Sequence, residues 1–393
     1  MTYGAVAPQL TDQANDIFPP HWYSPYWRPI NFPQSDACQN LNIWTPNIND
    51  GKKRPVMVWL HGGGYTAGSA QVEDVYDGEN LSRKGDVVVV SINHRLNSLG
   101  FLDLSAYDKK FSGNNGMLDI IAALRWIHEN IAQFGGDPDN VTVFGQSGGG
   151  AKILTLTAMP AANGLFHKAI VQSGANELMG MSLPDKEVSA RVAELTLQNL
   201  GIDASEVKNL QTLPYAELAD AANKAMVQAG EEFGPERVYQ GTFGWSPIVD
   251  GVNVMQDPVI GGFSDRANNI PLMIGTAANE WATMATSQTD NKNNWSDAEI
   301  ERRLRQKYGD KTDAVKTARI KSDQDAPYIF TWETPIMGGF GMAYHCSEIP
   351  FVFNNIELSG EATGATMIFD NKSVVRYHHD DKLMNILEPG YND

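Results

Sequence analysis

The sequence predicts an α/β fold, with a mostly parallel central sheet flanked by helices. Three observations indicate this class. Short apolar runs typical of buried strands recur along the chain. Segments with apolar residues at helical spacing separate several of these runs. No internal repeat interrupts the alternation. Alternating strands and helices favour a parallel sheet, because each connection between parallel strands crosses over through a helix.

The expected strands are short and rich in β-branched residues. Segment 41–44 alternates between apolar and polar residues, whereas 56–60 and 87–90 are apolar throughout. A run that is apolar at every position predicts a strand covered on both faces. Three further segments have the same character, namely 141–144, 169–171 and 272–274.

The clearest helix is expected over 117–134. Its apolar residues recur at helical spacing, and Gly135-Gly136 follows as a stop signal. Two more helices are expected at 186–200 and 215–229, outside the regular alternation. Helices in that position suit a lid or cap. We therefore expect a lid-like helical insertion at about 184–235.

The composition is that of a globular protein with a large core. Of the 393 residues, 42% are hydrophobic and 20% are charged, and we expect a single domain over 1–393. The net charge of −17 makes nucleic acid and anionic membranes poor partners. The two cysteines, Cys38 and Cys346, are far apart in sequence and are expected to be free thiols.

The sequence carries no sign of membrane insertion or export. No apolar run reaches the length of a membrane span. The first residues lack the basic start and apolar stretch of a signal peptide. A cytoplasmic location is therefore the default expectation, although a removed signal peptide would leave the same pattern.

The most informative segment is 145–149, which reads Gly-Gln-Ser-Gly-Gly. It follows the expected strand 141–144 and precedes a helix start, which is the context of a nucleophile elbow. There a serine lies on a sharp turn, and its neighbours are small because the backbone folds back on itself. The turn exposes the serine hydroxyl beside the positive end of a helix. Ser147 is therefore the candidate nucleophile.

A serine hydroxyl needs a base to take its proton and a third group to orient that base. Behind a nucleophile elbow the chain order is serine, acid, histidine. His345, which follows a glycine-rich stretch, is the best base by context, ahead of His167 and the pair His378-His379.

Two carboxylates compete for the acid. Glu280 follows the expected strand 272–274, which places it at the carboxyl edge of the sheet, where active sites of open α/β sheets gather. Asp250 is the competitor, although Asp250-Gly251 is first of all typical of a turn.

A glycine run follows the expected strand 56–60 and suits an oxyanion hole. Backbone N–H groups must be held where negative charge develops, and side chains at Gly62-Gly63-Gly64 would block close approach. Gly148 supplies a further donor as the residue after the nucleophile. A phosphate-binding loop is excluded, because the glycine run at 148–150 continues as Ala-Lys and not as Gly-Lys-Ser/Thr.

These motifs resemble the type-B carboxylesterase family, which includes bacterial para-nitrobenzyl esterases and the cholinesterases. Segment 36–43 is similar to the family's Glu-Asp-Cys-Leu-x-Leu-Asn signature, with departures at its start. Segment 134–149 closely resembles the family's other signature. The resemblance covers most of the chain. It implies an α/β-hydrolase fold and hydrolysis of carboxylic esters through an acyl-enzyme, with no metal and no organic cofactor.

The resemblance also implies a site with three parts: a catalytic triad, an oxyanion hole and two polar residues that support the triad from behind. In that order, they are Ser147, Glu280 and His345; Gly63, Gly64 and Gly148; and Ser173 and Glu348. Two positions depart from the family pattern. Gln146 replaces a glutamate that many members carry, so the site should be less negative, and Asn279 replaces the usual aspartate.

The chain looks shortened relative to the family. It starts after the segment that carries Phe-x-Gly-Ile-Pro-Tyr, and the stretch from Glu280 to His345 is compressed. The helix expected after 351–353 is also missing. We expect either a shortened or engineered version or a sequence from which segments are omitted, with all the motifs retained.

Three alternatives to a carboxylic ester hydrolase stay open, one of which is a truncated scaffold that keeps the motifs but has no stable site. The same triad can act on amides or carbamates, and a cholinesterase-like scaffold can also serve as a non-catalytic binding module. Such modules usually lose a triad residue, and none is lost here, so a small-molecule ester is the expected partner. Trp245, Trp281 and Phe340 are candidates for lining its pocket.

Overall fold

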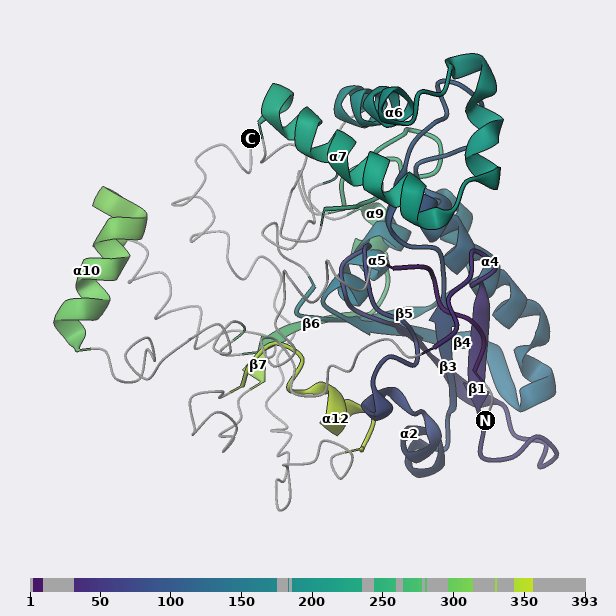
Figure 1. The fold of residues 1–393 in the computed structure, drawn as a ribbon. Helices are drawn as coiled ribbons and strands as arrows, with labels where there is room; N and C mark the ends of the chain where they lie inside the picture. The colour runs from purple at the N-terminus through teal and green to yellow at the C-terminus, as the bar shows by residue number, and fades with distance from the viewer. Residues whose placement is uncertain are drawn as a thin grey trace.

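A computed structural model describes residues 3–9, 32–174, 183, 186–234, 244–258, 264–277, 280, 296–313, 329–330 and 343–355. A seven-stranded sheet runs through it in the order β1-β3-β2-β4-β5-β6-β7 (Figure 1). The edge strand β1 is antiparallel to β3, and every other pairing in this sheet is parallel. The predicted α/β class with a mostly parallel sheet is confirmed.

The strands form at the predicted apolar runs and mostly extend beyond them, although β4 begins well before its run at Gly136 and β3 begins one residue late, at Val88. Their bounds are β1 Asn40–Trp44, β2 Arg54–Leu60, β3 Val88–Asn93, β4 Gly136–Gln146, β5 Lys168–Gln172, β6 Leu272–Ala277 and β7 Ile329–Phe330. Strand β7 is not predicted, because two residues are too few to form a recognisable pattern.

The register of the parallel strands brings their carboxyl ends to one edge. Leu60 of β2 pairs with Gly145 of β4, and Gln146 pairs with Gln172 of β5. Gln172 in turn pairs with Gly275 of β6. The segments that follow these strands therefore leave the sheet side by side, where sites in open α/β sheets form.

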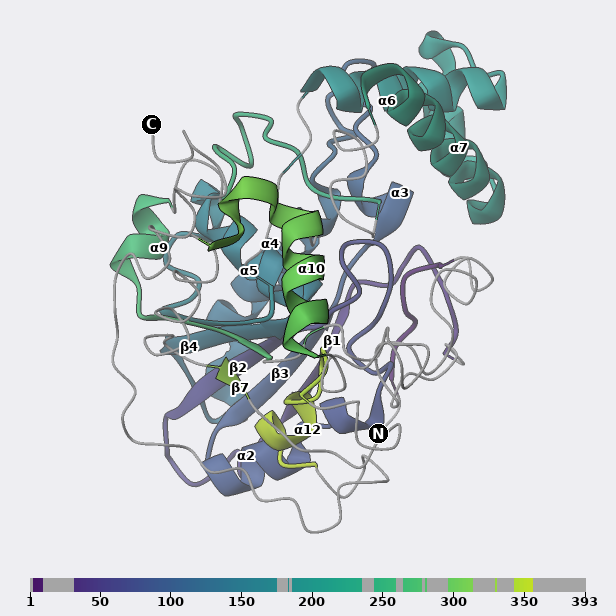
Figure 2. The ribbon, with the colours of Figure 1, turned by 90° about the vertical axis from the view of Figure 1, so that its left-hand side faces the viewer.

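Helices cover both faces of the sheet (Figures 1 and 2), with α4 and α5 on one face and α2 and α12 on the other. The predicted helix over 117–134 corresponds to α4 and the 3-10 turn Ile131–Phe134, which ends at Gly135 with φ 78°. The bounds are α2 Glu79–Gly85, α3 Asn97–Phe101, α4 Asn115–Asn130, α5 Gly148–Thr157, α6 Lys186–Leu200, α7 Tyr215–Phe233, α9 Asp265–Asn269, α10 Asp297–Tyr308 and α12 Ile349–Val352.

Helices α6 and α7 pack against each other away from the sheet (Figure 1). Arg191 of α6 pairs with Glu232 of α7, with Nε 2.7 Å from Oε2. Both helices fall within the predicted insertion at 184–235; its role as a lid and the single domain over 1–393 stay predictions. Among the described helices, none is long and apolar enough to cross a membrane.

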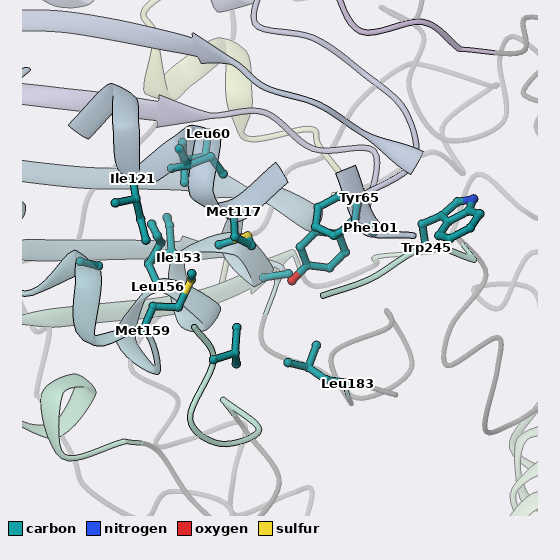
Figure 3. Close-up of a cluster of buried hydrophobic side chains, with 14 of the residues drawn as sticks. Leu60, Tyr65, Phe101, Met117, Ile121, Ile153, Leu156, Met159, Leu183 and Trp245 are labelled. Carbon is teal, nitrogen blue, oxygen red and sulfur yellow. The ribbon is translucent and has the colours of Figure 1, made fainter. Parts of the chain in front are cut away.

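The side chains of successive residues of β2 pack into two separate hydrophobic cores. Leu60 points to the face of α4 and α5 and belongs to the same buried cluster as Ile121 and Ile153 (Figure 3). Trp59 points to the other face, and its ring centroid lies 5.0 Å from that of Phe353, just after α12. Phe353 is completely buried. The second core therefore holds segment 343–355 to the sheet.

Deleting the Phe353 ring should detach this segment in part. Phe353→Ala is expected to lower the free energy of unfolding by about 3–5 kcal/mol, since the lost ring leaves a cavity among aromatic neighbours. Urea unfolding followed by circular dichroism measures the change. Val227→Ala on α7, where the side chain is 52% exposed, is the control and should change it by less than about 0.5 kcal/mol. A Phe353→Ala loss below about 1 kcal/mol would contradict this packing.

Candidate active site

Ser147 occupies the turn between β4 and α5, with φ 56° and ψ −125°. Residues other than glycine rarely adopt a positive φ. Backbone surrounds the turn closely. The Ser147 N–H donates to the Gln172 carbonyl at 2.8 Å. A Cβ on Gly149 would lie 2.0 Å from the Leu60 oxygen, and one on Gly174 would lie 2.4 Å from the Ser147 oxygen. Glycine is therefore required at both positions, and Gly149 is the last glycine of the G-x-S-x-G elbow.

Glu280 lies just beyond β6, where the strand end and its neighbours hold the carboxylate. Its Oε1 accepts hydrogen bonds from the Ala277 N–H at 2.9 Å and from the Thr276 hydroxyl. Burial raises the pKa of Glu280, but hydrogen bonds with His345, Ser173 and Thr276 outweigh burial, and the net pKa lies below its usual value. The carboxylate is therefore ionised at neutral pH.

His345 is bound to Glu280 twice. Its ring Nδ1 lies 2.5 Å from Glu280 Oε2, and its backbone N–H donates to the Glu280 carbonyl at 2.7 Å. An ionised carboxylate only accepts hydrogen bonds, so Nδ1 carries the proton and Nε2 has the lone pair. In this tautomer the imidazole can take a proton from a hydroxyl at Nε2.

Asp250, the competing carboxylate, is occupied by its own turn. Its Oδ1 accepts from the backbone N–H groups of Val252, Asn253 and Val254 at 2.7–3.0 Å. Its Oδ2 accepts from Asn114 at 3.1 Å. These bonds close the turn that Asp-Gly predicts. Of the two candidate carboxylates, Glu280 is the one that the structure brings to His345.

The remaining candidates lie elsewhere. His167 precedes β5, and its Nδ1 accepts from the Val141 N–H at 3.1 Å, on the amino side of the sheet. Trp245 is buried, and its Nε1 donates to Asn223 of α7 at 3.2 Å; its role in a substrate pocket stays a prediction. Outside the described residues lie His378, His379, Asn279, Trp281 and Phe340.

Gln146, the residue before Ser147, packs across the His345 ring. Its Nε2 is 3.4 Å from His345 Nδ1 and 3.3 Å from His345 Nε2. An atom equidistant from both ring nitrogens lies over the ring face, because in the ring plane it would collide with the carbon between them. The contact therefore positions the ring without using the in-plane lone pair of Nε2. The Cys346 thiol donates to Gln146 Oε1 at 3.2 Å and fixes the amide orientation.

The glycine loop after β2 touches the elbow directly. A Cβ on Gly148 would lie 2.4 Å from the Gly64 oxygen, and one on Gly63 would lie 2.4 Å from the Ala67 oxygen. Gly63 and Gly64 have φ values of 85° and 61°. Within the described part of the chain, the N–H groups of Gly63, Gly64 and Gly148 donate no hydrogen bond. The structure thus gathers the three predicted oxyanion donors beside Ser147.

Hydrogen bonds to the loop carbonyls determine where these donors point. In a trans peptide, a carbonyl and the following N–H point in opposite directions. The Gly62 oxygen lies 2.8 Å from His61 Nδ1, which must be the donor because a carbonyl oxygen only accepts. The Gly63 N–H, on the opposite side of the same peptide, therefore points away from the His61 ring. The Gly63 oxygen accepts from the Ala67 N–H at 3.0 Å, and this turns the Gly64 N–H outward.

Ser173 and Glu348 lie behind the triad. Ser173, at φ 50°, shares a hydrogen bond with Glu280, and its Oγ accepts from the Ala277 N–H at 3.4 Å. Glu348 is 1% exposed, and Gln172 Nε2 donates to its Oε1 at 3.4 Å. Burial raises the pKa of Glu348 to about 7, and the charge of Glu280 adds to the effect. The negative charge near His345 therefore rests mainly on Glu280.

Sequence reasoning misses three residues of this site: Thr276, Cys346 and Lys152. Thr276 and Cys346 are neighbours in sequence of Glu280 and His345, but only the folded chain shows which atoms they meet. Lys152 carries a usable signal, because it is a charged residue inside a helix start that is otherwise small and apolar. Among the described residues, no cluster of three or more His, Cys, Asp or Glu side chains could hold a metal.

Known proteins resemble this chain over most of its length. A family model described as "Carboxylesterase family" matches residues 2–331. The para-nitrobenzyl esterase of Bacillus subtilis (strain 168) is 37% identical over 382 residues, which cover 90% of this chain and 73% of that protein. The phenmedipham hydrolase of Pseudarthrobacter oxydans is 29% identical over 393 residues, which cover 90% and 72% of the two chains.

Solved structures show the same likeness. One is described as an esterase from anaerobic Clostridium hathewayi that can hydrolyze aliphatic aromatic polyesters. It has a TM-score of 0.73 at 36% identity and covers 92% of this chain and 75% of its own. The α/β-hydrolase fold, the resemblance to type-B carboxylesterases and the expected class of serine carboxylesterase are confirmed. The chain belongs to the carboxylesterase family.

Proposed function

We propose that this enzyme hydrolyses carboxylic esters through a triad of Ser147, His345 and Glu280 and an acyl-enzyme intermediate. The observation that carries the proposal is the contact of His345 Nδ1 with Glu280 Oε2 at 2.5 Å, beside the serine turn. It supplies an ionised acid and a histidine in the tautomer that a serine nucleophile needs. The relatives named above are esterases or hydrolases, which favours this chemistry.

For acylation we propose the following steps. His345 Nε2 takes the proton of the Ser147 hydroxyl as Oγ attacks the carbonyl carbon of the ester. The electron pair of the carbonyl moves to its oxygen, and the glycine N–H groups of the loop and the elbow bind that oxyanion. When the tetrahedral intermediate collapses, the bond to the alcohol breaks and His345 returns the proton to the leaving oxygen.

Deacylation reverses the same steps with water. His345 takes a proton from a water molecule, whose oxygen attacks the acyl carbon on Ser147. The oxyanion again forms at the glycine N–H groups. Collapse releases the carboxylic acid, and Ser147 Oγ recovers its proton from His345. Glu280 stays ionised throughout and stabilises the imidazolium.

We propose small aliphatic and aryl esters as the substrates. The para-nitrobenzyl esterase and the polyester-hydrolysing esterase named above favour this class. Amides and carbamates are the rival substrates for the same residues. Para-nitrophenyl esters of graded acyl length, assayed beside the matching anilides, separate the two. If the anilides are hydrolysed as fast as the esters, amides are favoured as the substrates.

The nucleophile can be tested by labelling. Ser147→Ala should lower kcat on para-nitrophenyl acetate by about 10⁴-fold or more, because only the oxyanion hole and substrate binding remain. A fluorophosphonate should label Ser147 in the parent enzyme, as peptide mapping would show. The control Ser69→Ala removes another buried serine hydroxyl and should keep kcat. A label found on Ser69 or Ser173 would overturn the assignment.

The acid can be tested against its competitor. Glu280→Gln should lower kcat by up to about 10⁴-fold, because the amide has one acceptor oxygen for two sets of donors and loses the charge that holds His345. Asp250→Asn is the matched control. It should cost about 1–3 kcal/mol of stability through its turn and leave kcat near the parent value. Kinetics and melts of both variants decide, and the opposite pattern would identify Asp250 as the acid.

The oxyanion loop can be tested with two glycines of similar conformation. Gly64→Val should lower kcat by about 10²- to 10³-fold, the usual effect of losing one donor. Gly51→Val is the control, because Gly51 also has a positive φ, 73°, but lies before β2 with open space around it. It should lower the melting temperature while kcat is retained. Equal kcat in the two folded variants would contradict the role of the loop.

A further inference from the structure

A completely buried lysine lies on the helix that follows the nucleophile. Lys152 of α5 has no exposed surface. A buried ammonium loses its hydration, which destabilises the fold unless compensating interactions are good. A residue of this kind at this place needs a reason beyond packing, since an apolar side chain would fill the same space at a smaller penalty.

The contacts of Lys152 point to the oxyanion loop. Its Nζ donates to the carbonyl of His61 at 2.9 Å, at the start of the loop. The Tyr65 ring lies beside the ammonium, with its centroid 5.8 Å from Nζ. Tyr65 is itself fixed, because its hydroxyl lies 3.1 Å from Thr155 Oγ1 and its ring packs edge-on against Phe101 (Figure 3). The lysine therefore ends in a rigid pocket.

The titratable groups that face Lys152 are neutral. His61 and His94 stack with ring centroids 5.2 Å apart, and burial together with the nearby lysine lowers both of their pKa values well below the usual range. Burial raises the pKa of Tyr65. Burial also lowers the pKa of Lys152, to about 7. Among these facing groups, Lys152 is thus the one that becomes positively charged as the pH falls below about 7.

Two successive carbonyls of the loop accept hydrogen bonds from buried side chains. Lys152 binds the oxygen of His61, and the His61 ring binds the oxygen of Gly62. The second bond sets the peptide whose N–H belongs to Gly63, one of the proposed oxyanion donors. Because Lys152 stands on the helix that begins after Ser147, its bond links the donors to the nucleophile through one side chain.

We propose that Lys152 is a positioning residue of the oxyanion hole. From α5 it fixes the His61 carbonyl and, through the His61 ring, the direction of the Gly63 N–H relative to Ser147. This inference rests on the proposed function. It predicts that the lysine matters more for the charged transition state than for substrate binding.

Lys152→Met tests this, because methionine has a similar length and no donor. kcat on para-nitrophenyl acetate should fall by at least about tenfold while KM changes by less than about twofold. The inhibition constant of an aryl trifluoromethyl ketone, whose adduct with serine carries an oxyanion, should rise by the same factor as kcat/KM falls. The melting temperature should change little, because the gain from no longer burying an amine offsets the loss of the hydrogen bond to the His61 carbonyl.

The pH dependence of the effect reports on the charge. A protonated lysine makes the stronger hydrogen bond, so the ratio of parent kcat to Lys152→Met kcat should decrease between about pH 6 and about pH 9. Thr157→Val is the matched control. It removes another buried polar group of α5, one that bonds to the Leu154 carbonyl within the helix, and it should leave kcat and inhibition unchanged.

Each result decides the proposal. A folded Lys152→Met enzyme with kcat and inhibition within about twofold of the parent would overturn it. If Lys152→Met does not fold, Lys152→Leu, which also lacks a donor, takes its place under the same criteria. Failure of both to fold would make Lys152 a structural residue and also overturn the proposal. Turnover that persists in Ser147→Ala would instead remove the proposed function.

Discussion

The site depends first on the crowded backbone around Ser147. The turn from β4 to α5 passes so close to β2 and to the chain after β5 that a single Cβ on Gly149 or Gly174 would meet a carbonyl oxygen at 2.0 or 2.4 Å. The same crowding brings Gly148 against Gly64. The serine turn, the glycine loop and the strand register therefore depend on one another sterically. A shift in any one of them would displace the other two.

Three parallel strand ends supply the chemistry around this turn. Strand β2 leads to the glycine loop 62–64, β4 to Ser147 and β6 to Glu280. His345 is not placed by a strand. It is held by Glu280 at one ring edge, by Gln146 on one face and by the core that Phe353 anchors. Two polar side chains that are costly to bury, Lys152 and Glu348, lie buried behind these residues. Groups of this kind gather at functional sites, where stability is given up for activity.

The local features of this design can be predicted from the sequence, and the long-range ones only in part. Ser147 and the loop 62–64 have short motifs whose steric requirements are local. The choice of Glu280 over Asp250 follows from contacts between segments distant in sequence, although position after a strand favours it. The charge of Lys152 in an apolar helix start is visible in the sequence, but its bond to the loop and the bond of Cys346 to Gln146 are not. Short elements such as α3, α9 and β7 escape prediction because so few residues show no periodicity.

We propose that the strained serine at position 147 carries the acyl group during turnover. Rapid acid quench of the enzyme during hydrolysis of a para-nitrophenyl ester, followed by mass spectrometry of its peptides, tests it most directly. We expect a transient mass increase of one acyl group on the peptide that contains Ser147, formed and lost at rates that sustain kcat. Steady turnover with no acylated peptide, or with the acyl group on another residue, would contradict it.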